Sequence, residues 1–456
     1  MGGMSDQIPE EPIAALATPY GRSALAVIRT SGPGVIDLLA SSFSAGKKLR
    51  GAQGHTLHHG RLMENGTPVD EVLLALFRAP RSYTGEDSIE IHCHGSRPGI
   101  QRILDLLYTL GIRPAEPGEF TLRAFMNGKL DLTRAEAVRE IVDAQTSTAQ
   151  ELALNRLGGS IERRIDALKK RLVKLLAALS IQLDYPEEET GEIPNDPDEL
   201  RGIAASLRDL AATYRTGRMY QEGVRVALGG RTNAGKSSLF NALLREDRAI
   251  VSDIHGTTRD YLEASVDVDG VPVILFDTAG LREANEEIEG EGIRRSKSIL
   301  TQADMVLYLV DATVGTARED SAFLEDVAAG AEESVLPVWN KVDLPGAQEA
   351  PEGFIPVSAL KAEGIAALLA EIRRRTLPAE RRAPGEPVID SIRQKKLLEA
   401  AAEAVDYVIE GVRGEMPADV LALDVQEAVN ALGEITGEVT TADLLDTMFE
   451  GFCVGK

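Results

Sequence analysis

The chain has 456 residues, more than one ordinary hydrophobic core accommodates, so two to four domains are expected. Its formal net charge of −23 at pH 7 argues against a broad basic surface for nucleic acid. Two distant cysteines, Cys93 and Cys453, exclude a disulfide framework, and no run of about 18 apolar residues predicts a membrane span. With acidic first residues that do not form a signal peptide, we expect a cytoplasmic protein without a membrane anchor.

Up to about residue 125 the sequence alternates short strand-like runs with a helical run. Residues 24–28, 72–77 and 88–93 have strand character, and residues 101–110 show helical spacing. This mixture predicts an N-terminal α/β domain, to which we assign residues 1–127.

The run at residues 88–94 alternates strictly between apolar and polar side chains. Alternate side chains of a strand point to opposite faces of its sheet. The residues expected to face the core are Ile89, Ile91 and Cys93. Those expected on the opposite face are Glu90, His92 and His94. Two histidines and a glutamate are also compatible with a metal site, although no further ligand is evident and paired strand histidines are more often simple polar-face residues.

From Thr133 the apolar spacing becomes helical and continues to about residue 179. Thr133 and Glu136 have the spacing of a capping box, which predicts the start of the first helix. A break rich in Asp, Glu and Pro at residues 184–197 precedes another helix, which ends near Tyr220. We assign residues 128–219 to the first part of a helical domain.

A third pattern occupies residues 220–380, which we assign to an inserted domain with a mostly parallel sheet. Its later strand-like segments are residues 262–268, 271–276, 305–310, 335–339 and 354–357. Asp269-Gly270 joins the first two of these as a hairpin. Helical spacing then returns, so residues 381–456 are the expected second part of the helical domain. The predicted fold class is therefore multidomain α/β and α.

Residues 230–237 read Gly-Arg-Thr-Asn-Ala-Gly-Lys-Ser, a complete G-x-x-x-x-G-K-S phosphate loop. An apolar strand-like run precedes it and a helical stretch follows it, which is the context that the motif requires. Its glycines let backbone N–H groups turn toward phosphates, Lys236 supplies a cation and the Ser237 hydroxyl is a magnesium ligand. The loop alone is compatible with ATP as well as GTP.

Three later motifs indicate a guanine nucleotide and therefore a GTPase: a switch sequence at residues 277–280, the guanine motif Asn-Lys-Val-Asp at 340–343 and the Ser-Ala motif at 358–359. A carboxylate at Asp343 accepts both the N1–H and the 2-amino hydrogens of guanine, and adenine offers no such pair of donors. The binding residues expected for GTP or GDP from the phosphate loop and these motifs are Asn233, Ala234, Gly235, Lys236, Ser237, Ser238, Asp277, Thr278, Ala279, Gly280, Asn340, Lys341, Asp343, Ser358, Ala359 and Leu360.

The switch sequences add information about the hydrolytic step. Residues 256–260, Gly-Thr-Thr-Arg-Asp, offer Thr258 as a second magnesium ligand. Leu281 stands where many small GTPases have the glutamine that orients water, so another group must do this. Asn233 suggests one solution, because its side-chain oxygen is suited to holding a monovalent cation against the phosphates. As an isolated residue, Asn233 is more typical of a turn.

Taken together, these residues resemble the MnmE (TrmE) family of tRNA-modification GTPases over nearly the whole chain. The motifs that carry the resemblance are residues 17–22, 83–87, 117–120, 129–132, 256–260, 277–283 and the carboxyl end Phe-Cys-Val-Gly-Lys at 452–456. The resemblance implies a folate-binding N-terminal domain that forms a homodimer, a helical domain interrupted by the GTPase domain, and potassium-stimulated hydrolysis when two GTPase domains dimerise. It also implies a FAD-dependent MnmG-type partner, with which the protein forms a heterotetramer. The partner would mainly hold the tRNA, whose wobble uridine is modified at C5.

The resemblance further implies the metal ligands and a catalytic residue of the GTPase domain. The implied potassium ligands are Asn233, Ser252, Ile254 and Thr257. The implied magnesium ligands are Ser237 and Thr258, and the same loop contributes the nucleotide contacts Asp253, His255 and Gly256. Glu289 is the implied catalytic glutamate, although on sequence alone it is one of several neighbouring acids, for which a solvated charge is the simpler interpretation.

A reduced folate, either 5,10-methylene- or 5-formyl-tetrahydrofolate, is the implied ligand of the N-terminal domain. Glu90 would accept two N–H bonds from the pterin edge. Arg29 and Lys129 would supply cations suited to the anionic glutamyl tail, and Lys456 would approach the same pocket. Cys453 would act beside the folate, with packing as a small apolar residue as the alternative.

A ribosome-assembly GTPase is the competing interpretation, because it would use the same nucleotide motifs. Such a protein is expected to carry a basic RNA-binding module, and we find none in this sequence. A folate-binding scaffold with a vestigial GTPase domain is disfavoured by the intact Lys236, Ser237 and Asp343.

Overall fold

The computed structural model describes residues 11–184, 196–245, 249–250, 262–277, 303–318, 320–324, 335–376 and 385–455. The chain forms two compact units. The first consists of Met1–Arg139, Arg156–Ala204 and Ala400–Lys456, and the second of Glu140–Asn155 and Ala205–Glu399. The domain boundaries that we assigned from the sequence remain predictions.

The first unit contains a six-stranded sheet with the strand order β3-β4-β5-β2-β1-β6. Only the pairing of β1 with β6 is parallel. The bounds are β1 Ile13–Leu16, β2 Ser23–Ser31, β3 Thr56–Glu64, β4 Thr67–Phe77, β5 Ser88–Gly95 and β6 Arg113–Pro114. The predicted runs lie in β2, β4 and β5. Strand β3 was not predicted, because it carries His58, His59 and Arg61 and lies at the edge of the sheet.

Helices cover one face of this sheet. They are α1 Val35–Ser41, α2 Gly46–Arg50 and α3 Arg97–Thr109, which share a hydrophobic core with the strands. The inward residues of β5, Ile89, Ile91 and Cys93, are at most 1% exposed, so their predicted orientation is confirmed. Burial raises the pKa of the Cys93 thiol to about 11, so this cysteine is a core residue.

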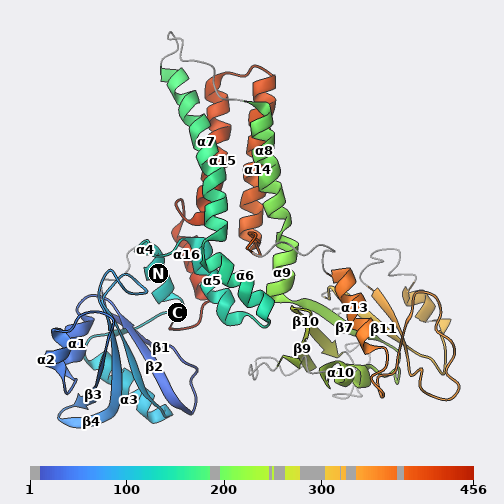
Figure 1. Ribbon diagram of the computed structural model, residues 1–456, viewed down its shortest axis with the longest axis horizontal. Helices are drawn as coiled ribbons and strands as arrows, with labels where there is room; N and C mark the ends of the chain where they lie inside the picture. The colour runs from blue at the N-terminus through green and yellow to red at the C-terminus, as the bar shows by residue number, and fades with distance from the viewer. Residues whose placement is uncertain are drawn as a thin grey trace. The chain divides into compact units, whose positions relative to one another are not determined.

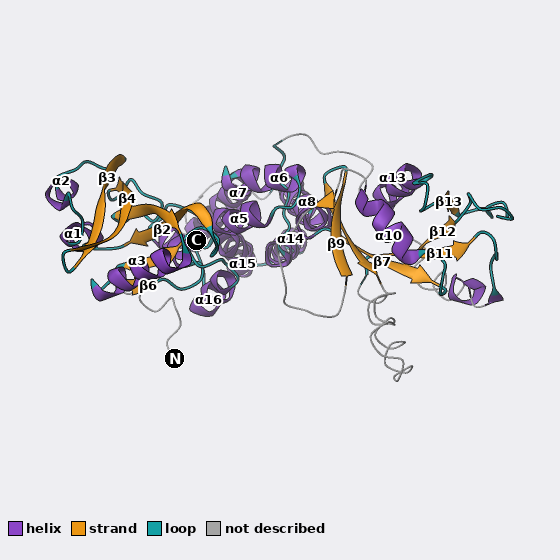
Figure 2. Cartoon of the chain, turned by 90° about the horizontal axis from the view of Figure 1, so that it is seen from below, coloured by secondary structure: helices purple, strands orange, loops and turns teal. Residues whose placement is uncertain are grey.

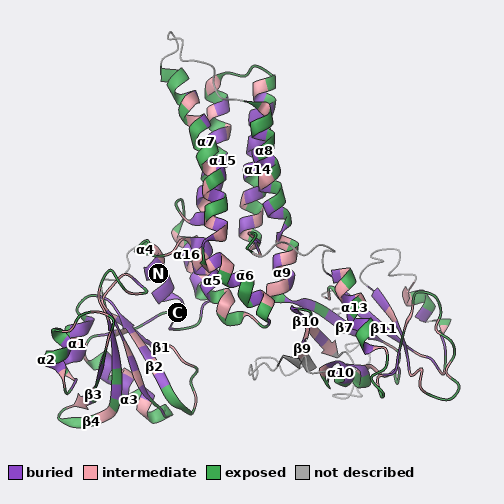
Figure 3. Cartoon of the chain, in the orientation of Figure 1, coloured by how far each residue is buried: buried purple, intermediate pink, exposed green. Residues whose placement is uncertain are grey.

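Helices, several of them long, form the rest of the first unit and part of the second (Figure 1). The helices are α4 Glu119–Met126, α5 Leu132–Asp143, α6 Ser147–Leu157, α7 Ser160–Asp184, α8 Pro197–Ala212, α9 Tyr214–Glu222, α14 Ile392–Arg413, α15 Ala418–Thr436 and α16 Ala442–Glu450. Helix α7 packs along α15, and its buried stripe consists of Ile161, Ile165, Leu168, Leu172, Leu175 and Leu179. Figure 3 shows this stripe as buried patches that alternate with exposed ones.

The capping box predicted at Thr133 and Glu136 is wrong by two positions. Helix α5 already begins at Leu132, and the residue before it, Asp131, provides the cap. Asp131 Oδ1 accepts hydrogen bonds from the backbone N–H groups of Thr133 at 2.8 Å and Arg134 at 3.2 Å. Aspartate is as good an N-cap as threonine, so the pattern alone did not decide between them.

The second unit contains a seven-stranded sheet with the order β13-β12-β11-β7-β10-β9-β8. Figure 2 labels β7, β9, β11, β12 and β13 of this sheet. The bounds are β7 Val224–Gly230, β8 Ala249–Ile250, β9 Leu262–Val268, β10 Val271–Asp277, β11 Met305–Asp311, β12 Val335–Asn340 and β13 Ile355–Val357. Five of the strands run parallel to one another: β10, β7, β11, β12 and β13. Strand β9 pairs antiparallel with β10, and β8 pairs antiparallel with β9. The predicted strands and the mostly parallel sheet are therefore confirmed.

The predicted hairpin is present between β9 and β10. Asp269 and Gly270 have φ angles of 53° and 91°, the left-handed pair that a two-residue type I′ turn requires. Helices α10 Lys236–Arg245 and α13 Ile365–Thr376 pack on the sheet. Both faces of β11 are buried, as expected for a central parallel strand. No helix within the described ranges is long and apolar enough to cross a membrane.

Candidate functional site

The phosphate loop joins the end of β7 to the start of α10. Gly230 and Gly235 have φ angles of 126° and 97°, which favour glycine. A Cβ atom on Gly235 would lie 2.2 Å from Asn340 Nδ2, and one on Gly230 would lie 2.4 Å from the Leu309 carbonyl oxygen. Both glycines are therefore required by conformation and by close packing against the neighbouring strands.

Lys236 folds back over this loop. Its Nζ donates to the carbonyl oxygens of Gly230 at 2.9 Å and Arg231 at 2.8 Å. The ammonium group thus stands at the N-terminus of α10, where Ser237 and Ser238 begin the exposed side of the helix. A cation together with a helix N-terminus is suited to binding phosphate groups.

Asn340 connects three of the predicted nucleotide motifs. It is 1% exposed, and its Nδ2 donates to the Ala234 carbonyl oxygen in the phosphate loop at 2.8 Å. Its Oδ1 accepts from the backbone N–H of Ala359 at 3.2 Å. This asparagine therefore fixes the phosphate loop and the Ser-Ala motif relative to each other.

Asp343 is oriented by Ser358. Ser358 Oγ donates to Asp343 Oδ1 at 2.7 Å and accepts from the Lys361 N–H at 3.1 Å. Ser358 is fully buried, whereas Leu360 is 83% exposed, so Leu360 is expected to contribute mainly through its backbone. The arrangement holds the carboxylate that we expect to read guanine.

Asp311 was not predicted as a site residue, but it holds Lys341 of the guanine motif. Lys341 Nζ lies 2.6 Å from Asp311 Oδ2, and Thr313 donates to Oδ1 from its backbone and its hydroxyl. Burial raises the pKa of Asp311, but the hydrogen bonds from Lys341 and Thr313 outweigh it and leave the pKa below its ordinary value. Asp311 stands at the end of β11, and ligand sites of parallel sheets lie at such strand ends. This position is the feature of the sequence from which Asp311 could have been predicted as a site residue.

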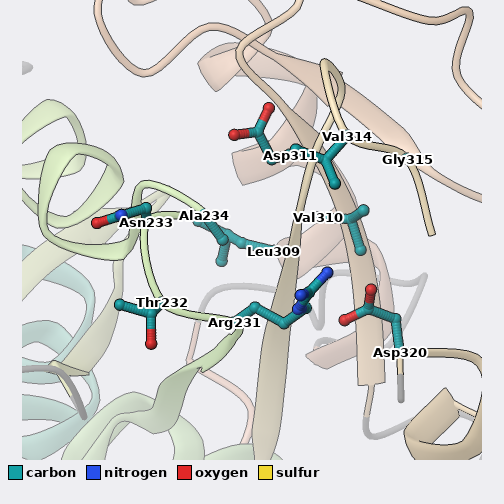
Figure 4. Close-up of a pocket in the computed structure, with 10 residues that line it drawn as sticks. All are labelled: Arg231, Thr232, Asn233, Ala234, Leu309, Val310, Asp311, Val314, Gly315 and Asp320. Atoms are coloured by element: carbon teal, nitrogen blue, oxygen red, sulfur yellow. The ribbon is translucent and has the colours of Figure 1, made fainter. Parts of the chain in front are cut away.

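A cavity of about 250 Å³ lies between the phosphate loop and the end of β11 (Figure 4). Its lining residues are Arg231, Thr232, Asn233, Ala234, Leu309, Val310, Asp311, Val314, Gly315 and Asp320. Asn233 is exposed and has a φ of 63°, a left-handed conformation that asparagine tolerates well. The turn therefore accounts for an asparagine at this position, and its role as a potassium ligand remains a prediction.

The switch residues are only partly described. Asp277 ends β10 and lies opposite Leu228 of β7, beside the strand end that leads into the phosphate loop. The remaining predicted switch residues, together with Glu289 and Lys456, lie outside the described ranges. These switch residues are Ser252, Asp253, Ile254, His255, Gly256, Thr257, Thr258, Thr278, Ala279 and Gly280.

A second cluster of predicted residues centres on Arg29 in the N-terminal sheet. Arg29 in β2 faces Glu90 in β5, and its Nε and Nη2 lie 3.0 Å and 2.9 Å from Glu90 Oε1. Its guanidinium carbon lies 5.4 Å from the centroid of the Tyr83 ring and 5.8 Å from that of Phe120. Nη1 donates to the carbonyl oxygen of Gly455 at 3.2 Å. The structure thus brings Arg29 and Glu90 together.

The carboxyl-terminal segment is part of this cluster. Residues Pro117 and Val454 form a β-bridge, and the Cys453 carbonyl oxygen accepts from the Gly118 N–H at 3.5 Å. Gly455 has a φ of 96°, and a Cβ there would lie 2.5 Å from the Leu16 carbonyl oxygen. Cys453 is exposed and free, as a reactive thiol would need to be.

Lys129 is exposed and contacts a different part of the same region. Its Nζ donates to the Pro80 carbonyl oxygen at 3.0 Å, in the loop that also carries Tyr83. The roles of Tyr83 and Phe120 next to Arg29 were missed, although both lie in motifs that carried the family resemblance. The motifs indicated that these residues matter but not what they contact.

The same unit contains a cluster of buried charges. Arg123 is fully buried and pairs with Glu86 at 3.2 Å and Glu119 at 2.9 Å. Burial raises the pKa of Glu119, but hydrogen bonds from Arg113, the Glu116 N–H and Arg123 outweigh it and lower the pKa overall.

Two of the three possible metal ligands in β5 are paired with other side chains. His94 Nδ1 lies 2.8 Å from Asp70 Oδ1, and Glu90 is paired with Arg29. In the described ranges there is no group of three or more His, Cys, Asp and Glu residues suited to binding a metal ion.

Comparisons with known proteins show the family of the chain. A family profile described as the MnmE helical domain matches residues 132–453, and one described as the GTP-binding protein TrmE N-terminus matches residues 12–129. The tRNA modification GTPase MnmE of Borrelia recurrentis (strain A1) is 43% identical over 460 residues, with 98% of each chain covered. The chain belongs to the MnmE family of tRNA modification GTPases.

Other relatives of the MnmE family are similar over the same extent. The tRNA modification GTPase MnmE of Aquifex aeolicus (strain VF5) is 40% identical over 455 residues, covering 98% of this chain and 100% of that protein. Among solved structures, the FeoB G-domain from Methanococcus jannaschii is 25% identical and covers 34% of this chain and 97% of its own, with a TM-score of 0.25. A TM-score this low adds no weight to the assignment. The predicted fold class, with TrmE N-terminal, helical and GTPase domains, is confirmed.

Proposed function

We propose that this MnmE-family GTPase hydrolyses GTP to drive the modification of tRNA at C5 of the wobble uridine, U34. The modification would be of the carboxymethylaminomethyl or aminomethyl type. It would require a FAD-dependent partner of the MnmG type and a reduced folate. The observation that carries the proposal is the meeting of Arg29, Glu90 and the carboxyl-terminal Gly455 in one cluster.

The residues of this cluster fit a reduced folate. The side chains of Arg29 and Glu90 are 21% and 24% exposed, so they are accessible from solvent although they are paired. A carboxylate is suited to the adjacent N–H groups of a pterin edge, and a guanidinium to the carboxylates of the glutamyl tail. Bound there, 5,10-methylene- or 5-formyl-tetrahydrofolate would supply a one-carbon unit beside Cys453.

The protein residues around the folate would bind and orient it. Tyr83 and Phe120 place aromatic rings beside Arg29, and the Tyr83 hydroxyl lies 2.9 Å from Thr121 Oγ1, which limits rotation of the ring. The Gly455 carbonyl holds one side of the Arg29 guanidinium. A planar ligand would therefore meet a preorganised surface, which lowers the entropy cost of binding.

In the GTPase domain we propose Mg²⁺ and K⁺ as cofactors of hydrolysis. The Lys236 ammonium and the N-terminus of α10 are suited to the phosphates, and Ser237 to Mg²⁺. The Asn233 side chain is exposed at the rim of the cavity, where a cation bound to its oxygen would stabilise developing negative charge. Potassium-dependent dimerisation of two GTPase domains would complete this site.

We also propose that the protein is a homodimer through its N-terminal domain. The sheet face opposite α1 to α3 carries exposed apolar side chains: Leu25 is 63% exposed, Leu57 69% and Leu73 43%. A second copy would remove these side chains from water. The MnmG-type partner would complete a heterotetramer and mainly hold the tRNA, because a chain with a net charge of −23 repels RNA. A cytoplasmic location is part of the same proposal.

Reconstitution with the FAD-dependent partner tests this function. Purified protein, partner, GTP, K⁺, reduced folate and unmodified tRNA should yield a C5-modified wobble uridine by nucleoside mass spectrometry. Omitting the folate or the GTP should abolish the product. Normal GTP hydrolysis with unmodified tRNA in the complete mixture would contradict the proposal and favour another GTP-dependent role, such as ribosome assembly.

A further inference from the structure

The segment between α5 and α6 is attached to the turn of the β9–β10 hairpin, within the second unit. Thr146 Oγ1 donates to the Gly270 carbonyl oxygen at 2.8 Å, and both residues are buried. One residue earlier, Gln145 Oε1 accepts from Ser265 Oγ in β9 at 2.9 Å. The start of α6 is therefore fixed to both the strand and the turn of the hairpin.

The fit between α6 and the turn leaves no room for a side chain. A Cβ atom on Gly270 would lie 2.1 Å from Thr148 Oγ1, and the left-handed φ of Gly270 adds backbone strain to any substitution. The Thr146 hydroxyl also accepts from the Ala149 N–H at 3.2 Å, so one hydroxyl both caps α6 and binds the turn.

A further contact fixes the end of α5 in the same unit. Gln221 Nε2 in α9 donates to the Glu140 carbonyl oxygen at 2.9 Å, and α9 itself packs on β10. Residues 140–155 accordingly belong to the same compact unit as the GTPase sheet. Movement of the hairpin would thus carry the end of α5 and the start of α6 with it.

The hairpin is the part of the sheet that joins the two switch sequences. Residues 256–260 lie just before β9, and Asp277 is the last residue of β10. Strand β10 also pairs with β7, whose end leads into the phosphate loop. A change of nucleotide that altered the switch sequences would therefore act on both ends of an element whose turn is attached to α6. Packed, rigid elements of this kind carry energetic coupling between distant sites.

We propose that the contact of Thr146 with Gly270 transmits conformational changes of the GTPase sheet, caused by exchange of GTP for GDP, to helices α5 and α6. We call this contact the joint. The inference concerns communication out of the GTPase domain and does not depend on the folate, the partner or the tRNA. It assigns a coupling role to Thr146, Thr148 and Gly270, which lie outside every nucleotide motif of the chain.

Amide hydrogen exchange of the full-length protein tests the joint. Peptides covering residues 132–157 are followed with Mg²⁺ and K⁺ in the presence of GDP or of a non-hydrolysable GTP analogue. We expect exchange in this segment to differ by at least about fivefold between the two nucleotides in the wild type, the lower end of typical coupling. In Gly270→Ala the difference should be lost, while GTP affinity stays the same within about a factor of two because the phosphate loop and Asp343 are unchanged.

Gly66→Ala is the matched control. Asn65 and Gly66 form the same kind of left-handed turn between β3 and β4, with φ angles of 49° and 81°, but a Cβ on Gly66 meets nothing within 4 Å. This variant has the same backbone strain without a displaced neighbour. Its nucleotide-dependent exchange in residues 132–157 should equal that of the wild type, and a loss there would overturn the joint as the cause.

Thr146→Val provides a second route if Gly270→Ala does not fold. It removes the hydroxyl that binds the turn, whereas Thr146→Ser keeps it, so we expect Val to abolish the nucleotide-dependent difference and Ser to retain it. The proposal is overturned if the wild type shows no nucleotide-dependent exchange in this segment. It is equally overturned if Thr146→Val responds to nucleotide as the wild type does.

Discussion

The two sheets of this protein build their sites in different ways. In the mostly parallel GTPase sheet, the functional loops start at the ends of neighbouring parallel strands, with Gly230 at the end of β7, Asn340 at the end of β12 and Ser358 after β13. Parallel strands end at the same edge, so motifs that follow each other in sequence meet in space. In the mostly antiparallel N-terminal sheet, the site is assembled from β2, β5 and the chain end, and Arg29 meets Gly455 across 426 positions.

This difference also governs what holds each site in place. In the GTPase site, the fully buried Asn340 joins two loops through neutral hydrogen bonds, and the Lys341–Asp311 ion pair is partly exposed, with side chains 28% and 17% exposed. The N-terminal unit, by contrast, contains a fully buried charge, Arg123, paired with Glu86 and Glu119. Neutral hydrogen bonds contribute about 1 kcal/mol each, whereas a buried charge left without its partner costs several times more. The two sites should therefore respond differently to substitution.

The largest expected effect is on the stability of the first unit. Arg123→Met leaves Glu86 without its buried cation and Glu119 with fewer hydrogen bonds, and should lower the free energy of unfolding by about 3–5 kcal/mol. Trp339, the single tryptophan, lies in the second unit. In urea, the part of the circular dichroism change that comes from the first unit should therefore move to lower concentration, while the tryptophan fluorescence transition remains in place.

Arg102→Met is the matched control for Arg123→Met. Its pair with Glu64, at 3.3 Å, has side chains 47% and 38% exposed. Exposed pairs contribute at most about 1 kcal/mol, so the variant should unfold almost as the wild type does. Equal destabilisation by the two substitutions would mean that burial of Arg123 is not the cause.

In the GTPase site, Asn233→Ala should lower the rate of GTP hydrolysis in K⁺ by about 10²–10³-fold with little change in nucleotide affinity. The reason is the loss of a ligand for a cation that stabilises developing charge. Single-turnover rates in K⁺ and Na⁺ at matched ionic strength measure the effect. If Asn233 serves only to allow the left-handed turn and binds no cation, the wild type will hydrolyse GTP equally fast with both ions.

Asp343→Asn should weaken GTP binding by about 2–3 kcal/mol, because the N–H groups of guanine lose a charged acceptor. The substituted amide should at the same time favour xanthine nucleotides, which present a carbonyl oxygen instead of the 2-amino group. Calorimetry with GTP and XTP measures both effects. Unchanged GTP affinity would remove Asp343 from the guanine site.

In the N-terminal site, Glu90→Ala should weaken the binding of 5-formyl-tetrahydrofolate at least tenfold, about 1.4 kcal/mol. GTP turnover should persist because the GTPase sheet belongs to the other unit. Cys453→Ser should likewise leave basal GTP turnover unchanged while lowering wobble-uridine modification with the partner. Wild-type protein that binds no folate in calorimetry would contradict the folate assignment itself.

The smallest effect concerns the exposed side of the N-terminal sheet. The hydrogen bond with Asp70 raises the pKa of His94 above its ordinary value of 6.5. The stabilisation from this pair is therefore present below pH 6.5 and is lost as the pH rises through the folded-state pKa. An NMR titration of the His94 ring should show the raised pKa in the wild type and an ordinary one in Asp70→Asn. The same midpoint in both would exclude this pair as the cause.

Most of the GTPase domain could be predicted from the sequence, because its strands are continuous apolar runs and its motifs are local. The predicted segments and the observed strands β9 to β13 agree closely, and the Asp269-Gly270 turn was predicted from two residues. Elements with weaker local signals were not found: β3 is polar and β1 has four residues. The cap of α5 was misplaced because Asp131 and Thr133 are both good N-caps, and only the observed backbone hydrogen bonds distinguish them.

By itself, the sequence determined which residues form the phosphate loop, the guanine motif and the inward face of β5, because each depends on spacing along a single segment. Tertiary structure alone decided that Tyr83, Phe120 and Gly455 surround Arg29, and that Asp311 holds Lys341. These contacts join segments whose separation in sequence bears no relation to their distance in space. Local patterns report the periodicity of a strand or a helix, whereas the pairing of distant side chains is set by how the sheets and helices pack.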